Sequence, residues 1–160
     1  MIETVADFHR NYFNSHKTEG GPKFLSTGLW KYSRHPNYLG ETLLWFGIWL
    51  SSSNGLWGIE TAYAILGLFS PAITFVLLVF ISGIPPAEKR DDERFKELPE
   101  YYEYKKQTSP YFFFPPSWYR DMPMILRKVP FCDIRDYTKL REPSAVNGDT
   151  SNVQEGSKKE

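Results

Sequence analysis

The chain consists of one long apolar stretch between two charged flanks. Between Glu41 and Glu88 the sole charged residue is Glu60. Two runs within this stretch are predominantly apolar, residues 38–50 and 61–84, and SSSNGLWGIE between them has the Ser, Asn and Gly of a tight loop. A membrane crossing needs about 20 apolar residues, which the second run supplies and the first approaches if its helix begins near Pro36. The pattern predicts a transmembrane helical hairpin.

Basic residues predict how this hairpin is oriented. Of the 19 Lys and Arg, five precede the hairpin and 14 follow it. Because basic residues favour the cytosolic side, both termini are expected there and residues 51–60 on the opposite side. Residues 1–21 lack the apolar core of a signal peptide. The alternative is a buried hairpin of a soluble protein, which the all-round apolarity of residues 75–81 disfavours.

The flanks predict short helices and hence an all-α fold, a membrane hairpin followed by cytosolic or interfacial helices. A short interfacial helix is expected within residues 1–27, and two helices after Pro85-Pro86, separated at Pro99. Nine of the residues from Tyr101 to Tyr119 are aromatic, which suits either a membrane interface or packing against the domain. We expect a membrane domain over 28–116, an interfacial extension over 117–140 and a disordered tail over 141–160.

Composition narrows the possible functions. The chain has 160 residues, enough for one domain, and 19 Lys and Arg balance 19 Asp and Glu. A zero net charge argues against a nucleic-acid partner, since such proteins usually carry a basic excess. Three histidines and the single Cys132 form no metal-binding pattern, and one cysteine cannot form an internal disulfide.

Candidate chemistry lies where the chain enters the first apolar run, in GLWKYSRHPNYLGE. If the helix starts at Pro36, Asn37, Tyr38 and Glu41 share a face, with Arg34 on it or just before it. A helix start and the guanidinium group of Arg34 attract phosphate or carboxylate, and His35 adds a second donor. The alternative is a capped helix with an interfacial tyrosine and Arg34 reaching the headgroups.

The string SRHPNYLGE, an apolar hairpin, SGIP and then YxxYKKxT resemble the DUF1295 family over about residues 28–115. That family is similar to the C-terminal domain of the steroid 5-alpha-reductases. The resemblance implies an NADPH-dependent membrane reductase that acts on a C=C bond of a lipid-soluble substrate, steroid-like or enoyl-like. It also implies the bilayer as partner, a role in lipid metabolism and, in a eukaryote, the endoplasmic reticulum.

The resemblance implies a cofactor site made of two blocks. The first comprises Arg34, His35, Asn37, Tyr38 and Glu41, and the second comprises Glu88, Tyr101, Tyr104 and Lys105. A solvated, salt-bridged amphipathic helix is the alternative for the second block. No catalytic acid is assigned, because in the steroid reductases that residue lies in a half that has no counterpart here. The chain is therefore expected to correspond to the C-terminal part of a larger helix bundle and to be inactive on its own.

Two other functions stay open at this stage. Arg-His-Pro-x-Tyr also occurs in the isoprenylcysteine carboxyl methyltransferases, where the same stripe would hold S-adenosylmethionine. Those enzymes carry a Glu-Glu pair after the hairpin, whereas Glu88 is followed by Lys89 and Arg90, which favours the reductase. The third possibility is a truncated membrane hairpin with no enzymatic function.

Overall fold

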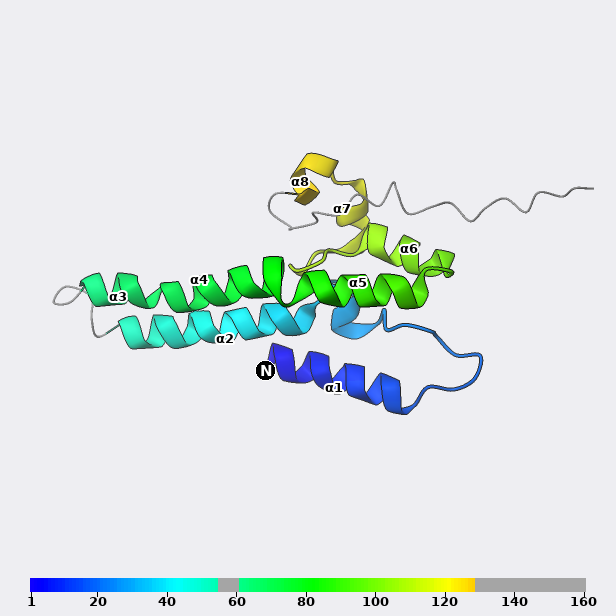
Figure 1. Ribbon diagram of the computed structural model, residues 1–160, viewed down its shortest axis with the longest axis horizontal. Helices are drawn as coiled ribbons and strands as arrows, with labels where there is room; N and C mark the ends of the chain where they lie inside the picture. The colour runs from blue at the N-terminus through cyan, green and yellow to red at the C-terminus, as the bar shows by residue number, and fades with distance from the viewer. Residues whose placement is uncertain (55–60, 129–160) are drawn as a thin grey trace, which may run out of the picture.

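The computed structural model describes residues 1–54 and 61–128, and every regular element in them is helical (Figure 1). The prediction of an all-α fold is thus confirmed for this part of the chain. The predicted loop at 51–60 falls mostly, and the predicted tail wholly, outside the described residues. The elements are α1 Ile2–Ser15, η1 Gly28–Lys31, α2 Pro36–Ser53, α3 Thr61–Gly67, α4 Phe69–Val76, η2 Leu77–Ile81, α5 Ile84–Phe95, α6 Pro99–Gln107, α7 Pro116–Asp121 and α8 Met124–Lys128.

Two long rods dominate the molecule and run side by side (Figure 1). The first is α2, which begins at Pro36 as predicted, because proline suits the first helical turn. The second is the continuous helical run from α3 to α5. At the end of the rods that contains α3, the indole nitrogen of Trp49 donates to the Ala64 carbonyl oxygen over 2.8 Å, which links the two rods.

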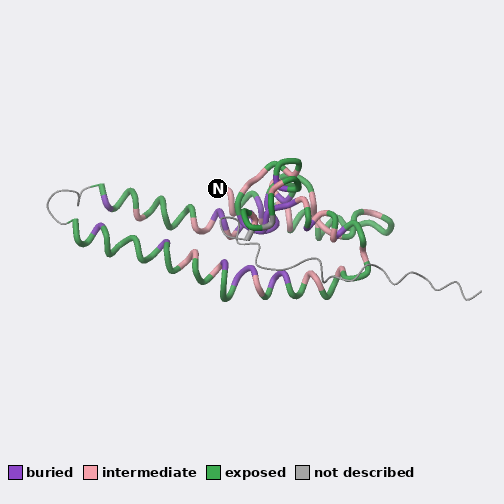
Figure 2. The backbone as a smooth tube through the Cα atoms, turned by 90° about the horizontal axis from the view of Figure 1, so that it is seen from above, coloured by how far each residue is buried: buried purple, intermediate pink, exposed green. Residues whose placement is uncertain are grey.

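The core lies at the opposite end, where the rods meet the segment after α6. Leu39, Val79, Ile84 and Tyr111 form its buried cluster, and Phe75 packs against it. The predicted aromatic segment therefore contributes to packing at Tyr111, while Trp118 of the same segment is exposed. Figure 2 shows the consequence: buried residues gather around this end, and the outer halves of the rods are largely exposed.

The second rod changes from apolar to charged after a wide helical turn. In η2 the helix is of the π type, and the Ser82 amide donates to the Leu77 carbonyl oxygen over 2.7 Å. A Cβ on Gly83 would lie 2.3 Å from the Leu78 carbonyl oxygen, so the close approach here requires glycine. After this turn α5 starts at Ile84 with proline in its first turn, and the chain becomes charged.

The N-terminal helix α1 packs against the start of α2. A Cβ on Gly40 would lie 2.4 Å from the Glu3 backbone nitrogen, so the backbones of α1 and α2 are in direct contact here. The Trp30 indole nitrogen donates to the Ala6 carbonyl oxygen over 3.2 Å and fixes α1 against η1 as well. The predicted N-terminal helix therefore exists, and it is an integral part of the fold.

One helix among the described residues is long and apolar enough to cross a membrane. It is Thr61–Phe95, with a mean hydropathy of 2.5 in its most apolar window. The first predicted span, in α2, does not pass the same test, since its first turn is polar and three serines end it. The antiparallel rods agree with the predicted helix pairing, while two crossings stay a prediction.

Candidate functional site

The site is built around the short segment before α2, which is clamped to the segment after α6. Ser33 and Ser109 form an isolated parallel β-bridge, and the Arg34 amide donates to the Ser109 carbonyl oxygen over 2.8 Å. The Ser33 hydroxyl donates to the Tyr111 carbonyl oxygen over 2.7 Å. These bonds hold Arg34 in an extended segment next to α5. Of the two predicted positions for Arg34, on the helical stripe or just before the helix, the structure shows the second, because α2 begins at Pro36.

Glu88 on α5 lies at the centre of the site and contacts three basic side chains. Its Oε2 lies 2.7 Å from Lys105 Nζ and 3.3 Å from an Arg34 guanidinium nitrogen, and its Oε1 lies 3.0 Å from His35 Nε2. Relative exposure is 5% or less for all four residues. The Glu88 carboxylate thus links the start of α2, α5 and α6 inside the protein.

Lys105 continues this network toward a second carboxylate. Its ammonium group also pairs with Asp92, one helical turn along α5 from Glu88. The Tyr101 hydroxyl donates to the same Asp92 oxygen over 3.2 Å. With Arg34 and Lys105 cationic and Glu88 and the partly exposed Asp92 anionic, the formal charges of these four residues balance, which offsets the cost of desolvating the buried ones.

Two tyrosines of α6 are held as hydrogen-bond donors. Burial, with help from the Glu88 and Asp92 carboxylates, raises the pKa of Tyr101 well above its usual value. Burial likewise raises the pKa of Tyr104, whose hydroxyl donates to the Trp30 carbonyl oxygen over 2.6 Å. Both phenols therefore stay protonated across the physiological pH range.

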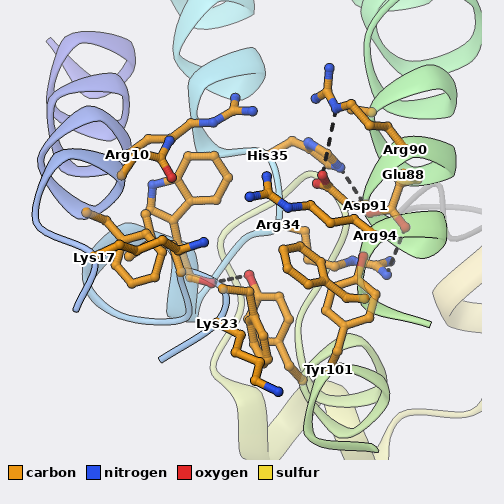
Figure 3. A pocket seen from close by; sticks show the side chains of 18 residues that line it. Arg10, Lys17, Lys23, Arg34, His35, Glu88, Arg90, Asp91, Arg94 and Tyr101 are labelled. Atoms are coloured by element: carbon orange, nitrogen blue, oxygen red, sulfur yellow. Dashed lines mark hydrogen bonds and ion pairs between the residues drawn. The ribbon is translucent and has the colours of Figure 1, made fainter. Parts of the chain in front are cut away.

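A cavity of about 100 Å³ opens beside the network, between α1, the segment before α2, α5 and α6 (Figure 3). Its lining is strongly basic: six Lys and Arg against the two carboxylates of Glu88 and Asp91. The six are Arg10, Lys17, Lys23, Arg34, Arg90 and Arg94. The lining therefore carries a formal excess of four positive charges, although the whole chain has none.

Three of these six cations are positioned by aromatic rings. Arg10 lies over the Trp30 ring at 5.7 Å, Lys17 over Phe13 at 5.4 Å and Arg94 over Phe95 at 5.3 Å. Such cation–π contacts orient a charge without neutralising it. Within residues 1–54 and 61–128 none of these three, nor Lys23, forms an ion pair, whereas Arg90 lies 3.8 Å from Asp91.

The structure brings together most of the predicted cofactor residues. Five of them line the cavity, and Lys105 lies directly behind Glu88. The five are Arg34, His35, Glu88, Tyr101 and Tyr104. What they bind stays a prediction, and here Arg34 already forms an ion pair with Glu88.

The other three predicted residues, all on α2, do not line the cavity. Tyr38 stacks on His35 with ring centroids 5.4 Å apart and packs against the core. Asn37 is buried, and its Oδ1 has no hydrogen-bond partner among the described residues. Glu41 is half-buried, with no ion pair in the described part of the chain.

Sequence reasoning missed the contribution of α1 and its following loop. Arg10, Phe13, Asn14 and Lys17 all line the cavity. Their spacing of 0, 3, 4 and 7 puts them on one helical face, a signal available from the sequence. It was outweighed by the polar to amphipathic character of residues 1–27, which predicted only an interfacial helix.

Comparison with known proteins establishes the family. The pattern of the family described as "Protein of unknown function (DUF1295)" matches residues 1–108, so the chain belongs to that family. The match begins at residue 1, which includes α1, whereas the motifs placed the resemblance from residue 28 onward. No curated protein and no solved structure matches the chain.

Proposed function

We propose that this DUF1295 protein is a membrane reductase, or the cofactor-binding part of one, that binds NADPH at the basic cavity and acts on a C=C bond of a lipid-soluble substrate. The observation that carries the proposal is the excess of four positive charges in the cavity lining. A pyrophosphate with a further phosphate is the kind of ligand that such a lining attracts.

The same charge distinguishes NADPH from S-adenosylmethionine. S-adenosylmethionine carries one carboxylate, one ammonium and one sulfonium, so its net charge is positive. A lining with six cations and two carboxylates would repel it overall. This electrostatic argument favours the reductase over the methyltransferase, and it is independent of the RHPNY motif that the two families share.

The exposed apolar rods support a membrane location. The apolar part of the second rod, Thr61 to Ile81, spans about 30 Å as a helix, close to the thickness of the hydrocarbon core. Large apolar side chains such as Leu44, Phe69 and Ile73 point outward from the rods. Two crossings with both termini cytosolic, in the endoplasmic reticulum of a eukaryote, place the basic cavity on the side where NADPH is available.

The protein's own residues would bind and orient the cofactor, which when bound supplies hydride. Arg34 and the cations of α1 and its following loop would contact phosphate oxygens. The protonated Tyr104 phenol, which donates to the Trp30 carbonyl oxygen, would help to keep the Arg34 segment in place. The cavity of about 100 Å³ is smaller than typical cofactor pockets of roughly 300–1,000 Å³. It therefore suits a phosphate-bearing part of the ligand, with the remainder outside it.

Calorimetric titration of the full chain in detergent tests this proposal. NADPH is expected to bind, with an affinity that falls as salt is raised because the contacts are ionic. Arg34→Gln is expected to abolish most of the binding heat. The matched control is Arg120→Gln, since Arg120 is an exposed arginine of α7 outside the cavity.

Other outcomes would favour the alternatives. Heat with S-adenosylhomocysteine and none with NADPH would support the methyltransferase. Heat with neither would support a hairpin without enzymatic function. NADPH affinity that is equal in Arg34→Gln and Arg120→Gln, with both variants folded by circular dichroism, would contradict the proposed site.

A further inference from the structure

A second groove adjoins the basic cavity and has a volume of about 550 Å³. Lys17, Lys23, Arg94 and Phe95 line both, so the cavity and this outer groove are continuous. The outer groove also has its own cation, Lys96, and a single carboxylate, Glu97. With four cations against one carboxylate, the outer groove is basic, as the inner cavity is.

A glycine turn brings the two lysines of the loop to this groove. The Gly21 amide donates to the Thr18 carbonyl oxygen over 3.1 Å, and Gly20 has a φ of 84°, in the left-handed region that favours glycine. The turn reverses the chain between Lys17, at the end of α1, and Lys23. A Cβ on Gly20 would meet no atom within 4 Å, so the backbone beside the groove is open.

The position of the outer groove argues against a lipid headgroup as its occupant. It lies at the C-terminal end of α5 and beside the loop after α1, the end of the molecule opposite α3 (Figure 1). From Ile84 to Phe95 the helix rises about 16 Å away from the apolar rod. A phosphate that arrives from solution reaches this groove, whereas a headgroup at the level of Ile84 does not.

The four cations are exposed and have no ion pair within residues 1–54 and 61–128. Lysine ammonium groups act as flexible point charges, suited to a compact dianion on a mobile part of a ligand. The inner cavity, by contrast, also contains the buried Arg34, which its ion pair with Glu88 holds in place. The inner cavity therefore suits a bridging phosphate, and the outer groove suits a terminal phosphate.

We infer that the outer groove of Lys17, Lys23, Arg94 and Lys96 binds the terminal phosphomonoester of the dinucleotide, the ribose 2′-phosphate, and so determines the preference for NADPH over NADH. This inference rests on the proposed function. It assigns cofactor specificity to α1, its loop and the end of α5, and leaves the RHPNY segment to bind the part that the two cofactors share.

The experiment compares a triple variant, Lys17→Gln/Lys23→Gln/Lys96→Gln, with the wild-type chain in detergent. All three lysines are exposed, so the variant should fold. We expect the affinity for NADPH and for 2′,5′-ADP to fall by about tenfold or more, and that for NADH and 5′-AMP to fall clearly less, with some loss because Lys17 and Lys23 also line the inner cavity. The matched control is Lys106→Gln, an exposed lysine of α6 that lines neither concavity.

Several results would overturn the inference, and they separate it from the proposed function. Equal losses of affinity for NADPH and NADH in the triple variant, or no loss at all, would overturn the inference. The proposed function would still stand if NADPH binding depended on Arg34. Binding of the wild-type chain to neither 2′,5′-ADP nor NADPH would overturn both. Lysine-dependent binding to anionic vesicles without binding of 2′,5′-ADP would replace the nucleotide by a lipid headgroup.

Discussion

At the scale of single residues, Glu88 organises the site. Its carboxylate contacts Arg34, His35 and Lys105, which come from two segments far from it in sequence. An isolated buried charge is costly, so each member of this network depends on the others for compensation. Ligand binding at Arg34 would therefore act on a pair that already exists, by sharing the guanidinium between Glu88 and a phosphate.

Removing the Glu88 charge should destabilise the protein. In Glu88→Gln the buried Arg34 and Lys105 cations lose a carboxylate, and we expect the free energy of unfolding to fall by about 3 kcal/mol. Chemical unfolding in detergent measures this. Glu103→Gln, which removes an exposed partner of Lys106, should cost under about 1 kcal/mol. Similar losses in the two variants would contradict the central role of Glu88.

Residue types were easier to predict than their pairings. The motifs identified Arg34, His35, Glu88 and Lys105, and all four meet. That Glu88 would pair with Arg34 across 54 residues was not predictable, because helical spacing relates only residues a few positions apart. The stripe Asn37, Tyr38 and Glu41 was assigned to the site for its polarity, yet Tyr38 packs against the core.

At the scale of elements, the positions of prolines made the starts of two helices predictable. Pro36 and Pro99 each stand at the first position of a helix, where the ring supplies a helical φ and no needed amide is lost. The contact between α1 and α2 was not foreseen, because it depends on the absence of a side chain at Gly40 opposite Glu3. Such a backbone contact leaves no periodic pattern in the sequence.

Gly40→Ala tests the α1–α2 contact. The added Cβ would lie 2.4 Å from the Glu3 nitrogen, so α1 must move away. We expect a loss of about 1–3 kcal/mol in unfolding free energy. Because Arg10 on α1 and Lys17 just after it line the cavity, weaker NADPH binding should accompany this loss.

Gly47→Ala is the matched control on the same helix. Nothing lies within 4 Å of its added Cβ, so the change should be neutral or slightly stabilising, as alanine favours helix. Thermal unfolding and NADPH titration of the two variants give the comparison. Identical behaviour would show that α1 does not depend on this close approach.

At the scale of the whole molecule, the protein separates into an apolar half and a charged half. The outer halves of α2 and of the α3–η2 rod are largely exposed (Figure 2) and carry large apolar side chains. The cations and carboxylates of the cavity come from α1, its loop, the segment before α2 and α5. The zero net charge of the sequence conceals this separation. Composition alone argued against a nucleic-acid partner, but it could not reveal a basic cavity.

Membrane extraction tests the role of the apolar half. The wild-type chain should stay with membranes after alkaline carbonate washing. Ile73→Arg, near the middle of the second rod, adds a cost of roughly 2.5–3.5 kcal/mol for a charge at the bilayer centre and should shift protein into the supernatant. The control Glu93→Arg places the same side chain at an exposed site on α5. Equal extraction of the two variants would count against a spanning helix.

The π-helical turn at Leu77–Ile81 affects how the following helix, α5, is rotated about the helix axis. One residue more or less in a helix rotates the downstream part by about 100° around the helix axis. The wide turn therefore sets the rotation of α5 about its axis. It directs one side of α5 inward, with Glu88 and Asp92 together on that side, at the point where the apolar run of the sequence ends.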